Sequence, residues 1–189
     1  MRLYTVIKNE LRDFKFEDLR YILFTDIEDL NEHKKILSIR NHPVIRANMY
    51  NDKEILFEEH LKFLESLNYS TDKLYWAVYD KDSLIGAVNI TEINFEHSRC
   101  KLGIYSDPTL KGYGKKLIRC LKYIVFDKFG FDVLRLEVLE SNHKAIEFYE
   151  KNNFKFEGKL RNYIKRKDFF INVLIYSITK EEYLNEKFE

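Results

Sequence analysis

The apolar and polar positions of this chain follow two different periods. Four segments repeat their apolar residues at helical spacing, and helices are therefore predicted over 31–42, 55–67, 113–128 and 142–152. Short apolar or alternating runs predict strands over 19–26, 74–80, 83–95, 99–106 and 132–139, followed by a hairpin about residues 165–168. Hairpin-connected strands followed by helical crossovers predict an α/β fold with a mixed sheet.

Composition and charge remove some classes of function. The chain of 189 residues has 32 Lys and Arg against 31 Asp and Glu, so no charge-driven nucleic-acid partner is expected. Residues 1–10 lack the apolar run of a signal peptide and no long apolar run follows, so we expect a cytoplasmic protein without a membrane segment. Cys100 and Cys120 form no CxxC pair, which argues against a metal site or a disulfide framework.

The segment DPTLKGYGKKLI (107–118) carries the first candidate chemistry. Gly112 and Gly114 lie between a predicted strand and an amphipathic helix, where free backbone N–H groups and the helix dipole favour an anion. Lys111, Lys115 and Lys116 add positive charge. Neither the Walker pattern nor the dinucleotide pattern GxGxxG is present. A phosphate site of another kind is predicted, and the alternative is a tight turn with solvated lysines.

A second motif, LEVLESNHKAIEFYEKNNF (136–154), follows the next strand and opens the next helix. Asn142 is placed to cap this helix, and Tyr149 lies four positions after Ala145 on its apolar face. A tyrosine in this place is either a core aromatic with a satisfied hydroxyl or a proton donor beside a leaving group.

Together the two motifs resemble the signature of the GNAT N-acetyltransferases, over residues 74–160. The resemblance implies the GNAT acyl-CoA N-acyltransferase fold, a mixed and mostly antiparallel sheet with flanking helices, and acetyl-CoA as co-substrate without a metal. It also implies that a backbone N–H within 102–104 polarises the thioester carbonyl and that Tyr149 protonates the leaving thiolate. The residues implied to bind the cofactor are Leu102, Gly103, Ile104, Lys111, Gly112, Tyr113, Gly114, Lys115, Asn142, Ala145 and Tyr149.

Three positions in these motifs are unusual. Thr109 stands where the family pattern has Gln or Arg, which removes one side-chain contact but leaves the backbone cradle. Asn153 stands where Gly usually precedes a phenylalanine, and Asn also tolerates a left-handed backbone at a helix end. Gly103 in the middle of a predicted strand indicates a bulge or a close approach by another group.

Two acids near the end of the strand 132–139 are candidates for the base that accepts the amine proton. Side chains alternate across a strand, so Glu137 shares one face with Arg135 and Leu139. A glutamate within an apolar strand is costly unless it is solvated or paired, which makes Glu137 the better candidate. Glu140 or water alone stays open as the base. The alternative role for Glu137 is a salt bridge with Arg135 or with a lysine of a neighbouring strand.

The acceptor is expected to bind the N-terminal half, at RNHPVIRANMY (40–50). Arg40 and Arg46 could grip a diphosphate, while Met49 and Tyr50 could stack on a base. With EEHLKFLESL (58–67), this segment resembles acetyltransferases that act on UDP-linked 4-amino sugars in bacterial nonulosonate synthesis. The residues implied to bind that substrate are Arg40, Met49, Tyr50, His60, Thr91, Glu92 and Tyr105.

This closer resemblance covers residues 20–178. It implies direct acetyl transfer, in a ternary complex, to the 4-amino group of a UDP-linked 4-amino-4,6-dideoxy sugar, a step of pseudaminic acid biosynthesis that serves flagellin glycosylation. It also suggests domain limits: an N-terminal extension over 1–15, a GNAT domain over 16–180 and a C-terminal tail over 181–189.

Two other functions stay open at this point. One is a peptide or ribosomal-protein N-terminal acetyltransferase, against which the Arg and His cluster within 40–60 argues. The other is a non-catalytic acyl-CoA-binding domain, against which Tyr149 and Glu137 beside an intact glycine loop argue. The expected partner is a small-molecule nucleotide sugar, with no nucleic acid and no membrane, and the existence of a homodimer is left open.

Overall fold

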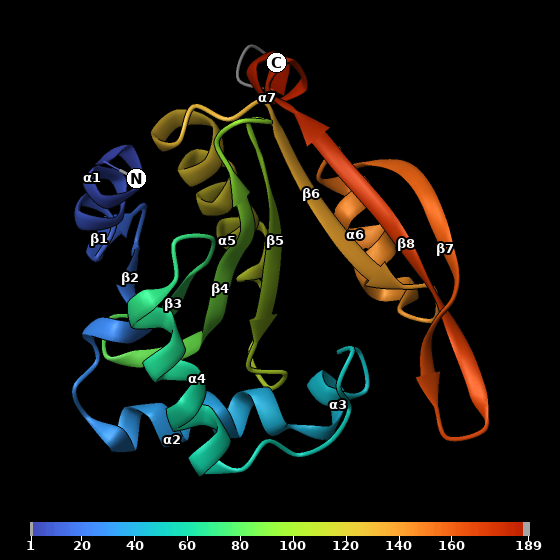
Figure 1. Cartoon of the computed structure of the whole chain (residues 1–189), viewed down its shortest axis with the longest axis horizontal. Helices are drawn as coiled ribbons and strands as arrows, with labels where there is room; N and C mark the ends of the chain where they lie inside the picture. The colour runs from blue at the N-terminus through green and yellow to red at the C-terminus, as the bar shows by residue number, and fades with distance from the viewer. Residues whose placement is uncertain (1, 187–189) are drawn as a thin grey trace.

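The computed structural model describes residues 2–186, which fold around one large sheet (Figure 1). Within these residues eight strands lie in the order β1-β2-β3-β4-β5-β6-β8-β7. Each neighbouring pair is antiparallel except β5 and β6, which are parallel. The predicted α/β fold with a mixed, mostly antiparallel sheet is confirmed. The strands are β1 (Asp13–Phe16), β2 (Leu19–Leu23), β3 (Leu74–Asp80), β4 (Ser83–Asn94), β5 (Arg99–Ser106), β6 (Val133–Leu139), β7 (Lys155–Arg166) and β8 (Phe169–Thr179).

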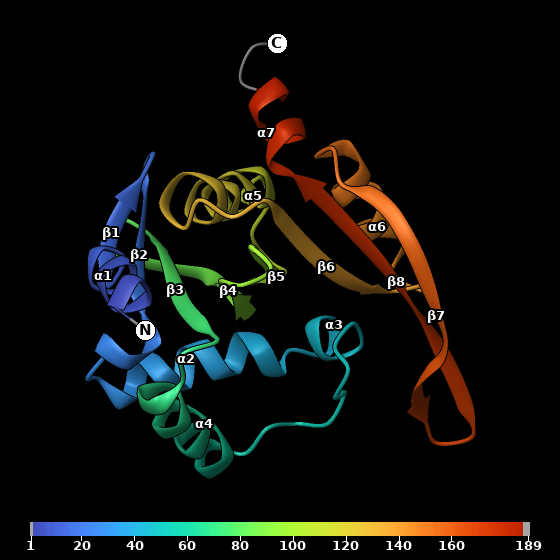
Figure 2. The same ribbon diagram turned by 45° about the horizontal axis from the view of Figure 1, so that its top comes forward.

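Helices cover both faces of the sheet (Figure 2). The core on one face combines α1, α5 and α6 with the sheet, and the smaller core on the other face combines α2 and α4 with it. The helices are α1 (Arg2–Glu10), α2 (Leu30–Asn41), α3 (Pro43–Arg46), α4 (Phe57–Tyr69), α5 (Gly114–Lys122), α6 (His143–Lys151) and α7 (Lys180–Glu186). The helix predicted over 113–128 begins as α5 and continues as a π-helical segment, Tyr123–Lys128. Over the described part of the chain, no helix is long and apolar enough to cross a membrane.

Side-chain caps set the ends of several helices. The Asp29 carboxylate accepts a hydrogen bond from the Asn31 backbone N–H at 2.8 Å, so Asp29 rather than Asn31 caps α2. Asn142 caps α6 as predicted, because its side-chain oxygen accepts from the Ala145 N–H at 3.2 Å. Pro43 follows the end of α2 and begins α3, as its missing N–H allows.

Residues 2–16 are built into the domain. Tyr4, Ile7 and Leu11 are buried in the larger core, and the Trp76 indole N–H donates to the Leu11 carbonyl at 2.7 Å. Because β1 pairs with β2, the boundary expected between residues 15 and 16 falls inside a strand of the sheet. The segment expected as an extension therefore contributes buried side chains and one sheet edge.

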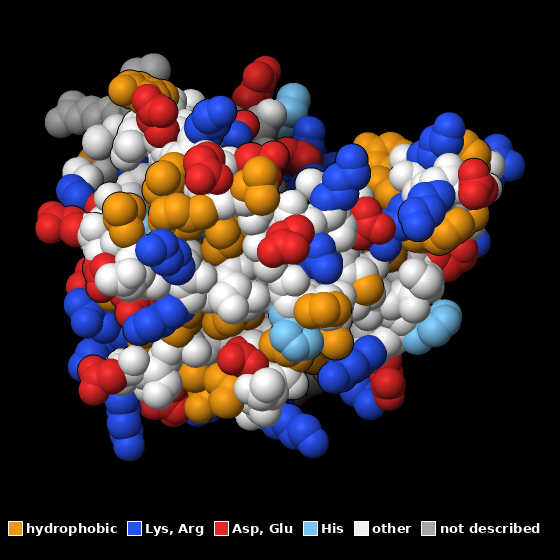
Figure 3. Space-filling model, turned by 90° about the horizontal axis from the view of Figure 1, so that it is seen from below, with side chains coloured by type: hydrophobic (Ala, Val, Ile, Leu, Met, Phe, Trp, Pro, Cys, Tyr) orange, Lys and Arg blue, Asp and Glu red, His pale blue; other side chains and the backbone are white. Residues whose placement is uncertain are grey.

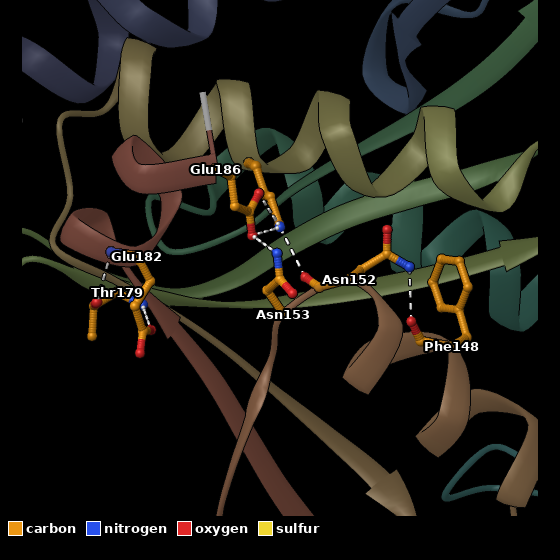
Figure 4. Close-up of polar contacts among 7 residues, drawn as sticks. Phe148, Asn152, Asn153, Thr179, Glu182 and Glu186 are labelled. Atoms are coloured by element: carbon orange, nitrogen blue, oxygen red, sulfur yellow. Dashed lines mark hydrogen bonds and ion pairs between the residues drawn. The ribbon is translucent and has the colours of Figure 1, made fainter. Parts of the chain in front are cut away.

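The C-terminal end is also anchored (Figure 4). Glu186 of α7 accepts hydrogen bonds from the buried Lys122 ammonium at 2.7 Å and from the Asn153 side chain at 3.0 Å. Tyr183 is buried, whereas residues 187–189 of the expected tail lie outside the described residues. Asn153 has a φ of 62°, so the prediction of a left-handed residue after α6 is confirmed.

The glycine in β5 has a different role from the predicted bulge. The register of β4 and β5 runs without a break through the pair Asn89 and Gly103, and the irregularity lies further along, between Thr91 and Asn94. A Cβ on Gly103 would lie 2.6 Å from the Asn89 side-chain nitrogen. The expected bulge at Gly103 is therefore wrong, while the expected close approach is confirmed.

The parallel pair at the centre of the sheet separates early. β5 and β6 pair only from Arg99 to Lys101 and from Val133 to Arg135, and beyond these positions the two strands diverge (Figure 1). Backbone groups of the following β5 residues that face β6 consequently have no strand partner there. This divergence positions the candidate site.

Candidate active site

A cavity of about 770 Å³ lies where β5 and β6 diverge. Its walls come from β4, β5, β6, α6, and the segment formed by α3 and the residues after it. The cavity brings together most of the predicted site residues from both halves of the chain. Those lining it are Arg40, Met49, Tyr50, Thr91, Glu92, Leu102, Gly103, Ile104, Tyr105, Glu137, Asn142, Ala145 and Tyr149.

The middle of β5 forms one wall of this cavity. Leu102, Gly103 and Ile104 follow the last residue that pairs with β6, so part of their backbone is free to bond a ligand. Gly103 lets the Asn89 side chain approach the strand, and Asn89 itself lines the cavity. The arrangement can bind an extended amide chain and can present an N–H to a carbonyl oxygen.

The glycine loop lies outside the lining of the large cavity, at the N-terminus of α5. Gly112 has a φ of +89°, and a Cβ added there would meet nothing within 4 Å, so its surroundings are open. Gly114 begins α5, and a Cβ there would lie 3.0 Å from the Phe148 ring of α6. The glycines therefore allow a left-handed turn and close helix packing, and they expose the first N–H groups of α5.

The lysines around this loop differ in whether an acidic side chain already pairs with them. Lys116 forms an ion pair with Asp18 at 2.5 Å. Lys111 and Lys115 form no ion pair within the described residues 2–186 and can supply charge to an anion. Thr109, the position that departs from the family pattern, donates its N–H and its hydroxyl to the Asp107 carboxylate at 2.8 and 2.6 Å. Thr109 thus holds the turn that precedes the glycines.

Tyr149 lies on α6 and lines the cavity from the side opposite the acceptor segment. Its ring packs against Phe148 and Phe154 with centroid distances of 5.4 and 5.8 Å. Burial raises the pKa of Tyr149 to about 12, so its hydroxyl is protonated at neutral pH. The residue can donate a hydrogen bond or a proton to a group in the cavity.

Glu137 lies deep in the same cavity and is surrounded by donors. Its Oε2 accepts hydrogen bonds from the Tyr50 hydroxyl at 2.7 Å and from the Lys101 ammonium at 3.2 Å, and its Oε1 lies 3.3 Å from Arg135. Burial opposes ionisation, but the Tyr50 hydrogen bond and the two cations outweigh it, so the pKa of Glu137 lies below its ordinary value. The salt-bridge alternative is thus realised, and Tyr50 must move before Oε2 can accept another proton.

Glu140, the other candidate base, is directed elsewhere. It is absent from the cavity lining, forms an ion pair with Lys159 and accepts from Asn172 at 2.7 Å. The expectation that it faces the site is wrong, because β6 ends at Leu139, the chain then turns into α6, and the Glu140 N–H donates to the Asn172 carbonyl of β8.

Arg40 extends from the end of α2 to the edge of the cavity. Burial lowers the pKa of its guanidinium, and Nη2 makes a long contact of 3.4 Å with the Asn51 carbonyl. Nη1 is buried without a hydrogen-bond partner in the part of the chain that the structure describes. A buried donor without a partner is costly, so this position is suited to an acceptor group of a ligand. Arg46 does not line the cavity.

His60 does not line the large cavity, which corrects its expected contact there. It is buried between α2 and α4, where its Nε2 shares a hydrogen bond of 3.3 Å with His33 Nδ1. Burial, followed by the proximity of His33, lowers the pKa of His60 to about 4. The ring lines a smaller cavity of about 190 Å³, which Arg40 and Tyr105 share with the large one. His60 therefore lies behind the large cavity, in the same smaller cavity as Arg40 and Tyr105.

Several cavity residues are missing from the prediction. Asn89 is a polar residue inside an apolar strand, so the reasoning applied to Glu137 could also have found it. Tyr75 resembles a core aromatic in the sequence, and Asp72 and Lys73 belong to a polar turn without a distinctive pattern. Only the fold places these three residues at the cavity.

The fold and the cavity define an acyl-CoA-dependent N-acetyltransferase, and comparison with known proteins agrees. The description of the acetyltransferase (GNAT) family matches residues 40–154, and the chain belongs to this family. It is an acetyl-CoA-dependent N-acetyltransferase. The residues present fit the co-substrate, since an open glycine turn lies at the N-terminus of α5 beside the divergence of β5 and β6.

Individual relatives narrow the comparison. The chain is 37% identical to acetyltransferase PseH of Campylobacter jejuni over 123 residues, which are 65% of this chain and 76% of that protein. The solved structure of the Campylobacter jejuni PseH in complex with acetyl coenzyme A has a TM-score of 0.65 at 26% identity, over 85% of this chain and 98% of the other. The Vibrio cholerae spermidine N-acetyltransferase in complex with CoA and spermine has a TM-score of 0.79 at 24% identity, over 90% of this chain and 100% of the other. This last likeness concerns the fold.

Proposed function

We propose that this enzyme transfers the acetyl group of acetyl-CoA to the 4-amino group of a UDP-linked 4-amino-4,6-dideoxy sugar, in pseudaminic acid biosynthesis and flagellin glycosylation. The sequence resemblance in 40–67 and the 37% identity to PseH support this substrate class. The observation that carries the proposal is Arg40, whose buried Nη1 at the cavity has no partner within the described residues. A diphosphate oxygen is the acceptor that such a group binds most strongly.

The charged side chains that line the cavity are of both signs, and they differ in whether another side chain already pairs with them. Lys101 forms ion pairs with both Glu92 and Glu137, and Arg135 forms a second ion pair with Glu137. Arg40 and Lys73 line the same cavity and form no ion pair within the described residues 2–186. Asp72 also lines the cavity without an ion pair, so the lining carries three cations against three carboxylates and has no net charge; what distinguishes Arg40 is its buried Nη1 without a partner in the described residues.

Direct transfer in a ternary complex assigns a role to each wall of the cavity. A backbone N–H within 102–104 stabilises the negative charge that develops on the thioester carbonyl oxygen when the amine attacks its carbon. Tyr149 donates a proton to the thiolate sulfur as the carbon–sulfur bond breaks. The proton that the amine loses passes to water or to Glu137 once Tyr50 has released Oε2. Met49 and Tyr50 contact the base or the sugar of the acceptor.

The experiment is a measurement of thiol release by the purified protein with acetyl-CoA and one amine at a time. The amines are a UDP-4-amino-4,6-dideoxy sugar, spermidine and a peptide with a free N-terminus. Rapid release with the nucleotide sugar, inhibited by UDP, is the expected result. Release with spermidine or the peptide alone would contradict the sugar acceptor. Release with none of them, together with binding of acetyl-CoA, would support the non-catalytic alternative.

A further inference from the structure

One arginine of the β7–β8 hairpin reaches across to the acceptor segment. We propose that Arg166 is a positioning residue for the acceptor, because it holds residues 47–52 against the cavity so that Met49 and Tyr50 can contact the acceptor. The identity of that acceptor rests on the proposed function, whereas the action of Arg166 on the segment does not.

The contacts of Arg166 are directed at the backbone of this segment. Its Nη1 donates to the Ala47 carbonyl at 3.1 Å, and its Nη2 donates to the Met49 carbonyl. Nη1 also lies 3.5 Å from the Asp52 carboxylate, and the Arg166 side chain is only 12% exposed. Hydrogen bonds from a charged donor are stronger than those between neutral groups, and the planar guanidinium can reach two carbonyls at once.

Other hydrogen bonds of the segment are local, because the N–H groups of residues 47–49 and the Asn48 side chain donate to carbonyls of α3. Residues 47–56 contain no helix or strand, and their ties to the α2 side come from two side chains. Arg40 makes the long contact with the Asn51 carbonyl, and Asn41 bonds the backbone of Ile55 through both its nitrogen and its oxygen. Arg166 bonds the backbone of the segment from the C-terminal half, at 119 positions from Ala47 along the chain.

The same segment carries a side chain into the centre of the cavity. Tyr50 donates to Glu137 of β6 at 2.7 Å, and its ring meets the Tyr163 ring of β7 edge-to-face at a centroid distance of 6.0 Å. Tyr50 is thus held between β6 and the hairpin, two residues before Asp52. Loss of the Arg166 contacts would release the backbone on both sides of Met49 and, with it, the Tyr50 hydroxyl.

The hairpin can hold the segment because its tip is paired continuously from Ile164 to Arg166. β7 and β8 pair up to the turn, and Arg166 lies at the last paired position of β7, opposite Phe169. Figures 1 and 2 show the hairpin extending beyond the rest of the sheet, and Figure 3 shows this projection with Lys, Arg and hydrophobic side chains on its surface. The backbone that carries the Arg166 side chain is therefore fixed by strand pairing.

The test compares Arg166→Gln with Lys165→Gln, a substitution one position away on the same strand. Hydrogen–deuterium exchange measures the amides of residues 47–56, with β3 of the same protein as an internal reference. We expect exchange in 47–56 to become about 10-fold faster in Arg166→Gln, since hydrogen bonds to a charged group are lost, and to stay unchanged in Lys165→Gln and in β3. Arg166→Lys should restore part of the protection.

Steady-state kinetics give the second readout. In Arg166→Gln the KM for the acceptor should rise about 10-fold while the KM for acetyl-CoA stays within about 2-fold, because the polar contacts of Arg166 are with residues 47–52 and not with the glycine loop. Unchanged exchange in 47–56 would overturn the proposal. Equal changes in both KM values, with faster exchange in β3, would assign Arg166 a merely structural role and also overturn it.

The two proposals can fail separately. If the wild type acetylates another amine but not the UDP-4-amino sugar, the proposed acceptor is wrong, and the KM comparison is made with the amine that reacts. The exchange result needs no acceptor, so it decides the role of Arg166 in either case. If Arg166→Gln does not fold, Arg166→Lys is compared with Lys165→Gln in the same two measurements.

Discussion

The cofactor side and the acceptor side of the cavity are built from different kinds of structure. The proposed cofactor side consists of β5, α5, β6 and α6, which follow one another in the chain and pack into the larger core. The acceptor side consists of the short helix α3, the irregular segment 47–56 and the end of the β7–β8 hairpin, which are joined by side-chain contacts over more than 100 positions. The first is fixed by packing and the second by a few polar contacts.

This difference in construction predicts how substitutions on each side affect the enzyme. A strand–helix unit with a buried core keeps the backbone geometry that a common co-substrate needs. A segment held by a few side chains can change its contacts at little cost to the core, and local stability is lowest in such regions. We therefore expect substitutions on the cofactor side to alter turnover or acetyl-CoA binding, and those on the acceptor side to alter the KM of the acceptor alone.

The largest effect is expected on the cofactor side, at Tyr149. Tyr149→Phe removes the proton donor while the ring still packs between Phe148 and Phe154. We expect kcat to fall about 100-fold or more, with the KM for acetyl-CoA little changed. Tyr69→Phe is the control, because Tyr69 is 83% exposed. Equal losses in kcat and in acetyl-CoA binding would contradict the role of Tyr149 as the acid.

The next effect is the pH dependence of protein stability that comes from His60, which lies behind the large cavity. The pKa of His60 falls from 6.5 to about 4 on folding, so between these values the unfolded chain binds a proton that the folded chain does not. Stability therefore decreases as the pH falls from 6.5 to 4, by about 3 kcal/mol in all.

Denaturant unfolding at several pH values measures this loss. His60→Phe should remove most of it, and the part that remains comes from His33, whose pKa is also lowered by burial. His97→Phe, on the exposed turn after β4, is the control and should leave the loss unchanged. If the wild type has the same stability at pH 4.5 and pH 7, His33 and His60 are not buried in their neutral forms.

Arg40 tests whether the acceptor side recognises an anion. Arg40→Gln should raise the KM for a UDP-linked amine about 10-fold, because one charge-assisted contact is lost, and should leave the KM for acetyl-CoA unchanged. The control is Lys34→Gln, on the exposed face of the same helix. A lower KM for spermidine in Arg40→Gln would be consistent with the removal of a repulsive charge, whereas an unchanged KM for the UDP-linked amine would show that Arg40 does not contact it.

The smallest effect is expected in the glycine loop. A comparison of two glycine substitutions distinguishes a role of Gly112 in acetyl-CoA binding from the backbone strain that any side chain would cause there. Gly112 and Gly130 have φ values of +89° and +69°, and a Cβ would meet nothing within 4 Å at either position. Each substitution by Ala should therefore lower the free energy of unfolding by about 1 kcal/mol. Only Gly112→Ala should also raise the KM for acetyl-CoA, by several-fold. Equal kinetic effects from Gly130→Ala would mean that strain alone explains the change.

Much of the fold could be predicted because its signals are local. The limits of β3 and β5 agree with the predicted 74–80 and 99–106, where runs of apolar residues are bounded by polar turns. The cap Asn142 could be found for the same reason, since a cap acts within three residues of its own position. The errors occurred where a residue far away in the chain determines the local structure. At Gly103 the side chain of Asn89 on β4 explains why a glycine is needed, and no bulge is present.

The sequence by itself determined the cofactor side of this protein. The glycine turn, the cap at Asn142 and Tyr149 lie within two short motifs, and the spacing inside a helix or a strand fixes how such residues are placed. Only the tertiary structure decided the acceptor side. It brought Tyr50 to Glu137 and Arg166 to the backbone of Met49, and it moved His60 behind the cavity. Such contacts depend on how elements that are far apart in the chain pack against each other. The periodicity of a single segment does not encode which distant segment it meets.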